Sequence, residues 1–292
     1  MKLSARQIAG YAKSLNIDDI RFARADGDVS LLRGGRVPLS SYLDTAKCMI
    51  ALFKSYLPAS GASAGKMAVS PYYIASNAAY HAANELVRHI NGSGGHAVRV
   101  SDISVREAAL RTGGFIGGNG FYYHDYLGSF VCIQIILTDA AEPIEYRKGE
   151  SRCLHCGRCA KACPSGAVPD IGSCLRAHIN GLVPERLRAD VYQLFGCERC
   201  QSACPLNSPE RSAPVEADLT ELLRGTATER LKALVGANTA RRTRLQSQAA
   251  LYAGAVRARE SAGILDELSR SSAEPVKTHA AWALERIKND KA

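Results

Sequence analysis

Eight of the ten cysteines lie between Cys153 and Cys204 and repeat one spacing. The first run, from Cys153 to Pro164, reads Cys-x2-Cys-x2-Cys-x3-Cys-Pro, and the second, from Cys197 to Pro205, reads Cys-x2-Cys-x3-Cys-Pro. Cys174 stands alone between them. Bacterial ferredoxins use this spacing to hold [4Fe-4S] clusters. The chain is therefore expected to fold so that two sets of thiolates converge.

The spacing also indicates which cysteines share a cluster. A loop with two residues between cysteines supplies three thiolates to one cluster, and the fourth cysteine of the run ligates the other cluster in two-cluster proteins. The first cluster is therefore expected on Cys153, Cys156, Cys159 and Cys204. Because the second run lacks its first cysteine, the second cluster is expected on Cys163, Cys174, Cys197 and Cys200, with the residues between Cys174 and Cys197 looped out as a helical insertion.

Other uses of these residues were weighed. Zinc also binds Cys-x-x-Cys pairs, but one zinc ion on two pairs leaves four cysteines and both prolines without a role. Cys48 and Cys132 fall inside predicted strands, where a cysteine acts as a small buried hydrophobe. His155 either hydrogen-bonds the first cluster or is simply exposed in its loop.

Composition limits the class of protein. A chain of 292 residues with 46% apolar content suits one large domain or two smaller ones. Met1 to Arg6 lacks the apolar core of a secretion signal, and no apolar run reaches the roughly 18 residues of a membrane span. We therefore expect a cytoplasmic protein without a membrane partner, where thiols serve metal or redox chemistry. The net charge of +9 suits a polyanionic partner without identifying one.

Short strands and helices without strict alternation predict an α+β domain over residues 1–145. Strands are expected at 20–25, 47–54, 97–100 and 129–138, a mobile small-residue segment at 60–65, and a helix at 76–90. Capping boxes, in which a hydroxyl and a Glu or Gln side chain satisfy free N-H groups of the first helical turn, are predicted at Ser4, Ser104 and Thr226.

The rest of the chain is predicted as a ferredoxin-like module at 146–212 and a helical region at 213–292. Asn238 is expected to cap a helix that ends by Arg259, and a further helix at 273–287 carries Pro275 in its first turn, where a missing N-H costs little. These helix pairs favour HEAT-like hairpins.

The cysteine runs and their flanking segments resemble the epoxyqueuosine reductases, cobalamin-dependent iron-sulfur enzymes of tRNA queuosine maturation. The resemblance covers most of the chain. Besides the cysteines, it is carried by Leu43–Leu52, Tyr80-His81, Arg111–Asn119, Phe130–Asp139 and His279–Arg286.

The resemblance implies a fold, cofactors and partners. It implies a nitroreductase-related domain that binds cobalamin, a ferredoxin-like module with two [4Fe-4S] clusters, and HEAT-like helices that hold tRNA. In the family, an external low-potential donor supplies electrons, the clusters pass them to the corrinoid, and an acidic residue donates a proton while the epoxide oxygen is removed. The expected cobalamin contacts are Phe115, Gly117, Gly118 and Asn119.

This chain departs from the family at several positions. The family's acidic residue stands in a D-x-x-P-x-x-E pattern, whereas Asp102 and Glu107 here have a shorter spacing and no proline between them. Asp102 is the nearest candidate proton donor, or alternatively a residue that opens the next helix. Ala79 replaces an acidic residue, Gly118 replaces a lysine, and the chain is shorter than typical members.

Two surfaces keep alternative interpretations. The loop from Gly113 to Gly120 closes a helix instead of following a strand, so it is not a dinucleotide fingerprint; it either receives a corrinoid, since glycine allows close approach of the backbone, or is a plain turn. Seven basic and no acidic residues lie between Arg230 and Arg259. They favour RNA contact through Arg241, Arg242 and Arg244, or form a solvated helix face.

Three functions remain after the sequence analysis. The first is an iron-sulfur oxidoreductase that reduces epoxyqueuosine in tRNA or acts on a related substrate. The second is an electron-transfer or corrinoid-reducing partner protein without an RNA substrate. The third is a tRNA-binding module whose clusters are structural. The oligomeric state is left open.

Overall fold

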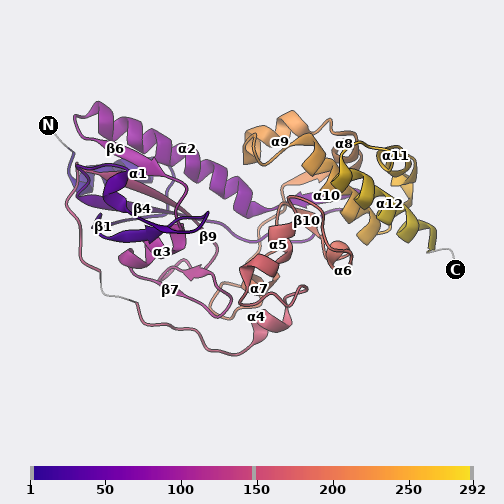
Figure 1. Cartoon of the computed structure of the whole chain (residues 1–292), viewed down its shortest axis with the longest axis horizontal. Helices are drawn as coiled ribbons and strands as arrows, with labels where there is room; N and C mark the ends of the chain where they lie inside the picture. The colour runs from indigo at the N-terminus through magenta and orange to yellow at the C-terminus, as the bar shows by residue number, and fades with distance from the viewer. Residues whose placement is uncertain (1–2, 147–148, 290–292) are drawn as a thin grey trace. The chain divides into compact units, whose positions relative to one another are not determined.

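The computed structural model describes residues 3–146 and 149–289, and the chain forms two compact units (Figure 1). Unit 1 consists of residues 1–56 and 75–155, and unit 2 of residues 57–74 and 156–292. This division differs from the predicted boundaries near 145 and 212. The cysteine-rich and helical regions lie together in unit 2, and they share a hydrophobic core.

Unit 1 is an α+β structure built around a four-stranded sheet. The strand order is β1-β4-β9-β6, and every neighbouring pair is antiparallel. The strands of unit 1 are β1 (Asp19–Arg24), β2 (Asp28–Ser30), β3 (Arg36–Pro38), β4 (Cys48–Ser55), β6 (Ala97–Val100), β7 (Phe115–Ile116), β8 (Tyr122–Tyr123) and β9 (Val131–Thr138). Its helices are α1 (Ala5–Ser14), η1 (Leu39–Ser41), α2 (Pro71–Gly92), α3 (Val105–Ala109) and η2 (Leu110–Thr112).

Both faces of this sheet are covered. In the central strand β4, Ile50 and Leu52 pack on a cluster that includes residues of α1 and α2. Met49 and Phe53 point to the opposite face and pack on residues of α3 and the loops around it. Alternate side chains of a strand face opposite ways, so an unbroken apolar run is what a strand buried on both sides requires.

The sequence predicted most of unit 1. The predicted strands match β1, β4, β6 and β9, and the capping box of Ser4 and Gln7 is present. At the second predicted box, Ser104 accepts the backbone N-H of Glu107, but the Glu107 carboxylate does not return to Ser104. It accepts the backbone N-H of Ser30 and pairs with Arg36 at 2.8 Å instead. A strand distant in sequence therefore competes for the carboxylate that the local pattern assigns to the cap.

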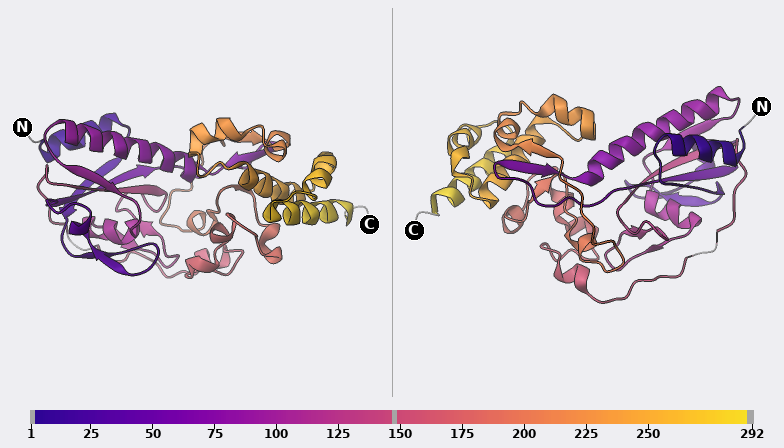
Figure 2. Two further views of the ribbon diagram at one scale, coloured as in Figure 1. Left: turned by 45° about the horizontal axis from the view of Figure 1, so that its top comes forward. Right: turned by 180° about the vertical axis from the view of Figure 1, so that it is seen from behind.

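Unit 2 contains a three-stranded sheet in the order β10-β5-β11, with β10 parallel and β11 antiparallel to β5. The central strand β5 (Lys66–Val69) lies in the segment that precedes α2. Both strands that pair with it come much later in the sequence. Figure 2 shows this purple strand beside orange segments in both views. The edge strands are β10 (Gln193–Leu194) and β11 (Glu216–Asp218).

Short helices carry the cysteine region, and longer ones follow it. The former are α4 (Arg158–Lys161), η3 (Ile171–Ser173), α5 (Leu175–His178), α6 (Glu185–Arg188) and α7 (Arg199–Ser202). The latter are α8 (Leu219–Arg224), α9 (Thr228–Val235), α10 (Arg242–Ala255), η4 (Arg259–Ser261), α11 (Ala262–Leu268) and α12 (Glu274–Lys288).

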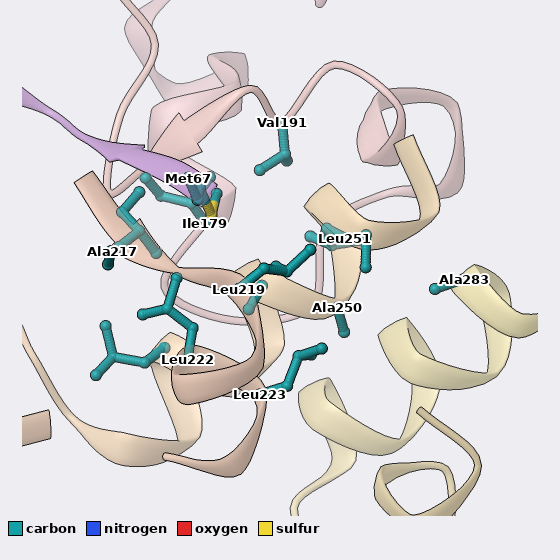
Figure 3. Close-up of a cluster of buried hydrophobic side chains, with 14 of the residues drawn as sticks. Met67, Ile179, Val191, Ala217, Leu219, Leu222, Leu223, Ala250, Leu251 and Ala283 are labelled. Carbon is teal, nitrogen blue, oxygen red and sulfur yellow. The ribbon is translucent and has the colours of Figure 1, made fainter. Parts of the chain in front are cut away.

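The core of unit 2 joins all of these parts. Met67 of β5, Ile179 after α5 and Leu219 of α8 belong to one buried cluster with Leu251 of α10 (Figure 3). Ala283 of α12 belongs to the same cluster. The cysteine region is therefore held by the helical region through apolar packing.

Two predicted caps in unit 2 are wrong. Helix α9 begins after Ala227, and the hydroxyl of Thr226 donates to the carbonyl of Glu221 instead of capping. Helix α10 begins after Arg241, not at Asn238. The helix with Pro275 in its first turn is confirmed as α12. In the described ranges, no helix has the length and apolarity needed to cross a membrane.

Candidate functional site

The two cysteine loops are local repeats of each other. Cys156 to Pro164 and Cys197 to Pro205 share the pattern Cys-x-Arg-Cys-x-x-Ala-Cys-Pro. Each loop places its middle cysteine in a one-turn helix, α4 or α7, and these two helices pack together. The pattern therefore gives the same local structure twice within unit 2.

Four thiols of unit 2 lie near one another. Burial raises the pKa of Cys197 to about 11, and charge on Cys174 and Cys163 adds to the rise. Burial also raises the pKa of Cys200 to about 12, with further contributions from Cys197, Cys174, Cys163 and Cys159. Such mutual effects require proximity, so the four cysteines that the sequence assigned to the second cluster lie near one another, with Cys159 of the first set beside them.

The second loop is held in place by polar contacts around it. Arg199 donates to the carboxylate of Asp190 at 2.7 Å and lies over the Tyr192 ring. The Tyr192 hydroxyl accepts the backbone N-H of Glu198 at 2.9 Å. Glu198 itself is buried, and burial raises its pKa while the hydroxyl of Ser70 donates to it. The loop is thereby fixed immediately before Cys200.

Cys163 is placed to ionise. Burial raises the pKa of this thiol, but hydrogen bonds from the Ser165 hydroxyl and from the backbone of Ala167, Ser165 and Val168 outweigh burial and lower it. The Ser165 hydroxyl lies 3.4 Å from the sulfur. The thiolate is the form that binds iron, so this loop favours ligation.

The donor set suits cubane clusters. Within residues 3–146 and 149–289, no three His, Cys, Asp or Glu side chains are arranged as ligands of a single metal ion. In a cubane, each thiolate binds a different iron atom, so the four sulfur atoms surround the cluster and do not meet at one ion. Six cysteines in two repeated loops, together with Cys153 and Cys174, therefore fit two [4Fe-4S] clusters.

Cys153 belongs to unit 1, where the glycine loop holds it. The Gly118 backbone N-H donates to the Cys153 sulfur at 3.4 Å. The segment before Cys153 also packs on this loop: Arg152 donates to the carbonyl of Asp125 at 2.7 Å and lies over the Phe115 ring. The first cysteine of the first run is thus attached to the loop predicted to bind the cofactor.

The glycine loop is a hairpin between β7 and β8. The Phe115 ring stacks on Tyr123 with centroids 5.1 Å apart, and the buried Asn119 amide donates to the Tyr123 hydroxyl at 3.0 Å. A Cβ at Gly117 would lie 2.5 Å from the Tyr123 ring, so this position requires glycine. At Gly118 the only heavy atom within 4 Å of an added Cβ is the Cys153 sulfur, among the described residues.

A charged network under the hairpin was not found from the sequence. Arg21 of β1 donates to the carboxylates of Asp19 (2.8 Å) and Asp125 (2.6 Å) and to the carbonyl of Thr112 (2.6 Å). The buried His124 ring contacts Asp19 through Nε2 at 2.8 Å. Burial raises the pKa of Asp19, but His124 and Arg21 outweigh it and bring it to about 2.

The backbone fixes the tautomer of His124. The N-H groups of Tyr126 and Leu127 both point at Nδ1, each at 3.4 Å. Nδ1 is therefore the acceptor, and Nε2-H donates to Asp19. The network ties the start of β1 to the residues that follow the hairpin, which fixes the base of the glycine loop. Asp19 and Asp125 are 106 residues apart in sequence, so only the fold brings them together.

Asp102 lies in the loop between β6 and α3. Its side chain is exposed, and it accepts a hydrogen bond from the Tyr42 hydroxyl at 2.8 Å. Its carbonyl accepts the N-H of Leu32 at 2.8 Å. The N-cap of α3 is Ser104, so Asp102 does not cap that helix.

The three arginines predicted to contact RNA do not form one face. Arg242 donates to the carbonyl of Arg224 at 3.1 Å and packs on Gly225. Arg241 and Arg244 instead line a cavity at the start of α10. Cys48 and Cys132 are buried in β4 and β9, as expected of core residues.

Comparison with known proteins agrees with the cysteine pattern. Two family models described as 4Fe-4S binding domains match residues 146–168 and 195–213. The chain is 31% identical over 168 residues to the epoxyqueuosine reductase of Burkholderia pseudomallei, and 28% identical over 205 residues to that of Vibrio cholerae. The alignments cover 47% and 62% of this chain. Over these aligned segments, the chain is therefore similar to epoxyqueuosine reductases.

The alignments leave part of these relatives unmatched, because they span 41% of the Burkholderia and 54% of the Vibrio protein. Solved structures show the same fold. The epoxyqueuosine reductase of Bacillus subtilis superposes with a TM-score of 0.78 at 22% identity, over 97% of this chain and 90% of that one. A family structure with an epoxyqueuosine-modified tRNA stem loop superposes with a TM-score of 0.79 at 21% identity, over 97% and 89%.

Proposed function

We propose that this protein is an iron-sulfur reductase that removes the epoxide oxygen of epoxyqueuosine in tRNA. The observation that carries the proposal is the repeated cysteine loop, twice matched as a 4Fe-4S binding domain, in a chain with the fold of epoxyqueuosine reductases. Removing the oxygen as water consumes two electrons and two protons and leaves a carbon-carbon double bond. The clusters would carry these electrons one at a time from an external low-potential donor.

The cluster ligands are proposed as the sequence assigns them. The second cluster takes the four neighbouring thiols of unit 2, Cys163, Cys174, Cys197 and Cys200. The first takes Cys153 of unit 1 with Cys156, Cys159 and Cys204 of unit 2. On this proposal, the second cluster lies wholly within unit 2.

Cobalamin is proposed as a further cofactor, beside the glycine loop of unit 1. The loop fits a flat, apolar ring, because the Gly118 backbone is open and the adjacent Ile116 side chain is 39% exposed. A bound cobalamin would supply a reducing metal centre for cleavage of the epoxide C-O bonds. Of the four expected contacts, Phe115, Gly117 and Asn119 shape the hairpin, and Gly118 faces Cys153.

The remaining assignments follow the fold of the family. Unit 1 is proposed to be nitroreductase-related, and the paired helices of unit 2 to be HEAT-like and to contact tRNA. Asp102 is proposed as the proton donor, because its carboxylate is exposed and is held by a hydrogen bond from the Tyr42 hydroxyl. A soluble cytoplasmic location accords with a tRNA substrate.

The test uses anaerobically purified protein with its clusters. About eight iron atoms per chain are expected. The protein is supplied with cobalamin, a low-potential reductant and a stem loop that carries epoxyqueuosine, and nucleoside mass spectrometry should show the loss of one oxygen atom. Asp102→Asn should slow this conversion without changing the iron content. Iron-loaded, cobalamin-bound protein that leaves the nucleoside unchanged would contradict the proposal and favour an electron-transfer partner.

A further inference from the structure

A cavity of about 340 Å³ lies in unit 2 at the first turn of α10. Three segments supply most of its wall: Asn180 after α5, the residues from Asn238 to Ser247, and Pro275 at the start of α12. The volume is within the usual range of small-ligand sites. None of the cluster cysteines lines it.

Two helix N-termini meet at this cavity. Helix α10 has 14 residues and α12 has 15, and their N-cap positions are Arg241 and Ala273. In the part of the chain that the structure describes, no side chain caps either helix. In α10, the first-turn N-H groups therefore lack intrahelical partners, and the helix dipole makes this end favourable for an anion. In α12, Pro275 has no N-H and the Val276 N-H donates to the Ala273 carbonyl, so this end contributes mainly its dipole.

Arg244 adds a positive charge without a carboxylate partner among the described residues, and its Nη1 atom donates to the carbonyl of Thr239 at 3.4 Å. Its guanidinium lies over the Phe195 ring at 5.1 Å, and its Nε and Nη2 atoms are buried with no hydrogen-bond partner among the described residues. Burial lowers its pKa, as do the charges of Arg176 and Arg241, whereas Tyr73 raises it. A half-buried cation beside other cations is costly, and a bound anion would offset that cost.

Ser247 provides a buried hydroxyl donor in the cavity wall. The backbone N-H of Val183 donates to Nε2 of His279 at 3.1 Å, so the proton of the neutral ring is on Nδ1. Nδ1 then donates to the Ser247 oxygen at 2.8 Å. Ser247 is only 4% exposed, and a hydroxyl oxygen that accepts from Nδ1 leaves its hydrogen for a second partner. It is free to bind a ligand oxygen.

The cavity has no acidic wall residue within the described chain. Glu274 is the acidic residue next to it in sequence, and its carboxylate accepts a hydrogen bond from Thr278 on its own helix at 2.6 Å. The site therefore combines two arginines, two uncapped helix ends and a buried hydroxyl donor without a competing carboxylate.

We propose that this cavity binds a phosphate group, held by Arg241, Arg244, Ser247 and the first turn of α10. The phosphate comes either from the backbone of an RNA or from a small phosphorylated molecule, since both present the same oxygens. The site is independent of the cluster chemistry. It can therefore be tested separately from the proposed reductase reaction.

The experiment is a calorimetric titration of the full-length, cluster-loaded protein with inorganic phosphate at low salt. Thr243 lines the cavity in the first turn of α10, where an acidic residue stabilises a helix. Thr243→Glu should therefore fold while its carboxylate repels phosphate. We expect Thr243→Glu and Arg241→Ala each to weaken phosphate binding roughly tenfold or more, because each removes or opposes a charge-assisted contact.

Arg270→Ala is the matched control. It removes one positive charge from unit 2 at an exposed arginine that pairs with Asp266 at 2.7 Å and does not line the cavity. Its phosphate affinity should equal that of the unmodified protein. Unmodified protein that does not bind millimolar phosphate, or cavity variants that bind as tightly as Arg270→Ala, would overturn the proposal.

An unmodified RNA stem loop distinguishes the two phosphate sources. If Thr243→Glu weakens both phosphate and stem-loop binding, and the stem loop displaces phosphate, the site holds an RNA phosphate. If Thr243→Glu weakens phosphate binding but keeps its affinity for the stem loop, the site holds a small phosphorylated ligand. Both results retain the phosphate site. Neither depends on conversion of epoxyqueuosine.

Discussion

At the scale of single residues, we expect the Gly118 backbone N-H to influence the cluster proposed on Cys153. A hydrogen bond to a ligating sulfur stabilises the more negative, reduced cluster and so raises its potential. Gly118→Pro removes the N-H that points at Cys153. We expect the potential of one cluster to fall by roughly 20 to 65 mV, the equivalent of a net hydrogen bond of about 0.5–1.5 kcal/mol. A redox titration followed by electron paramagnetic resonance measures it.

Gly118→Ala is the control for this change. It keeps the N-H, and its Cβ would lie 3.4 Å from the Cys153 sulfur, an ordinary contact distance. Its potential should match that of the unmodified protein. If the alanine and proline variants shift equally, the N-H is not what sets the potential.

A second residue-scale prediction distinguishes the cysteines proposed as cluster ligands from those buried in the core. Cys200→Ala removes a thiol that lies near three others, so we expect the second cluster to be lost and the iron content to fall from about eight to about four atoms per chain. Cys132→Ala removes a thiol buried in β9 and should keep all the iron. Iron analysis of both variants is the measurement, and equal iron in the two would refute the assignment.

The cysteine spacing was informative because its chemistry is local. Two cysteines separated by two residues reach the same cluster whatever the rest of the chain does. Cys197 and Cys200 could therefore be assigned to one cluster before the fold was known. The network of Arg21 with Asp19 and Asp125 could not be predicted from the sequence, since its members come from distant strands and loops. Their residue types have no distinguishing pattern along the sequence.

At the scale of secondary structure elements, His279 joins α12 to α10 and to the segment around Val183. Burial lowers its pKa to about 4, and Arg188 contributes. The unfolded ring titrates near 6.5, so between about pH 6.5 and 4 the unfolded state binds more protons. The contribution of neutral His279 to the free energy of unfolding is therefore complete above pH 6.5. It decreases as the pH falls, by about 2 kcal/mol at pH 5.

The measurement is thermal unfolding at pH 7 and pH 5 for the unmodified protein and for His279→Gln. The unmodified protein should lose more stability on acidification than the variant, because glutamine does not titrate. The difference between the two proteins is the relevant quantity, since acid also protonates cluster thiolates in both. Equal losses would show that His279 is not the titrating group.

Element boundaries could be predicted where the local signal had no competitor. The capping box at Ser4 and Gln7 formed as the pattern indicates, on an exposed helix end. At Ser104, the Glu107 carboxylate was taken by Ser30 and Arg36. At Asn238, the chain continues through a turn, and α10 starts with its backbone N-H groups free at the cavity. At Ser104, the predicted cap failed because tertiary partners used the same carboxylate.

At the scale of the whole molecule, each unit has its own core, and the residues 57–74 belong to unit 2. Met67 of β5 is fully buried there, and Met49 of β4 is fully buried in unit 1. Either methionine changed to Ala should cost about 2–5 kcal/mol by leaving a cavity. We expect Met67→Ala to lower hydrogen-exchange protection in α8 and α10, and Met49→Ala to lower it in β1 and β9.

The two variants serve as controls for each other, since the substitution is the same and both sites are fully buried. Loss of protection in β9 with Met67→Ala, to the same degree as in α10, would show that the units unfold together. That outcome would refute independent cores. The sequence did not predict the transfer of residues 57–74 to unit 2, because a four-residue strand is recognised by its partners, not by its own pattern.

The central place of β5 has a consequence during synthesis of the protein on the ribosome. Its partners β10 and β11 begin at Gln193 and Glu216, so well over a hundred residues are translated after Val69 before either edge of β5 is paired. Every strand of the unit 1 sheet has been made by Thr138. The N-terminal sheet can therefore close around its own core while β5 waits as an open strand, which a chaperone or a neighbouring nascent chain can bind.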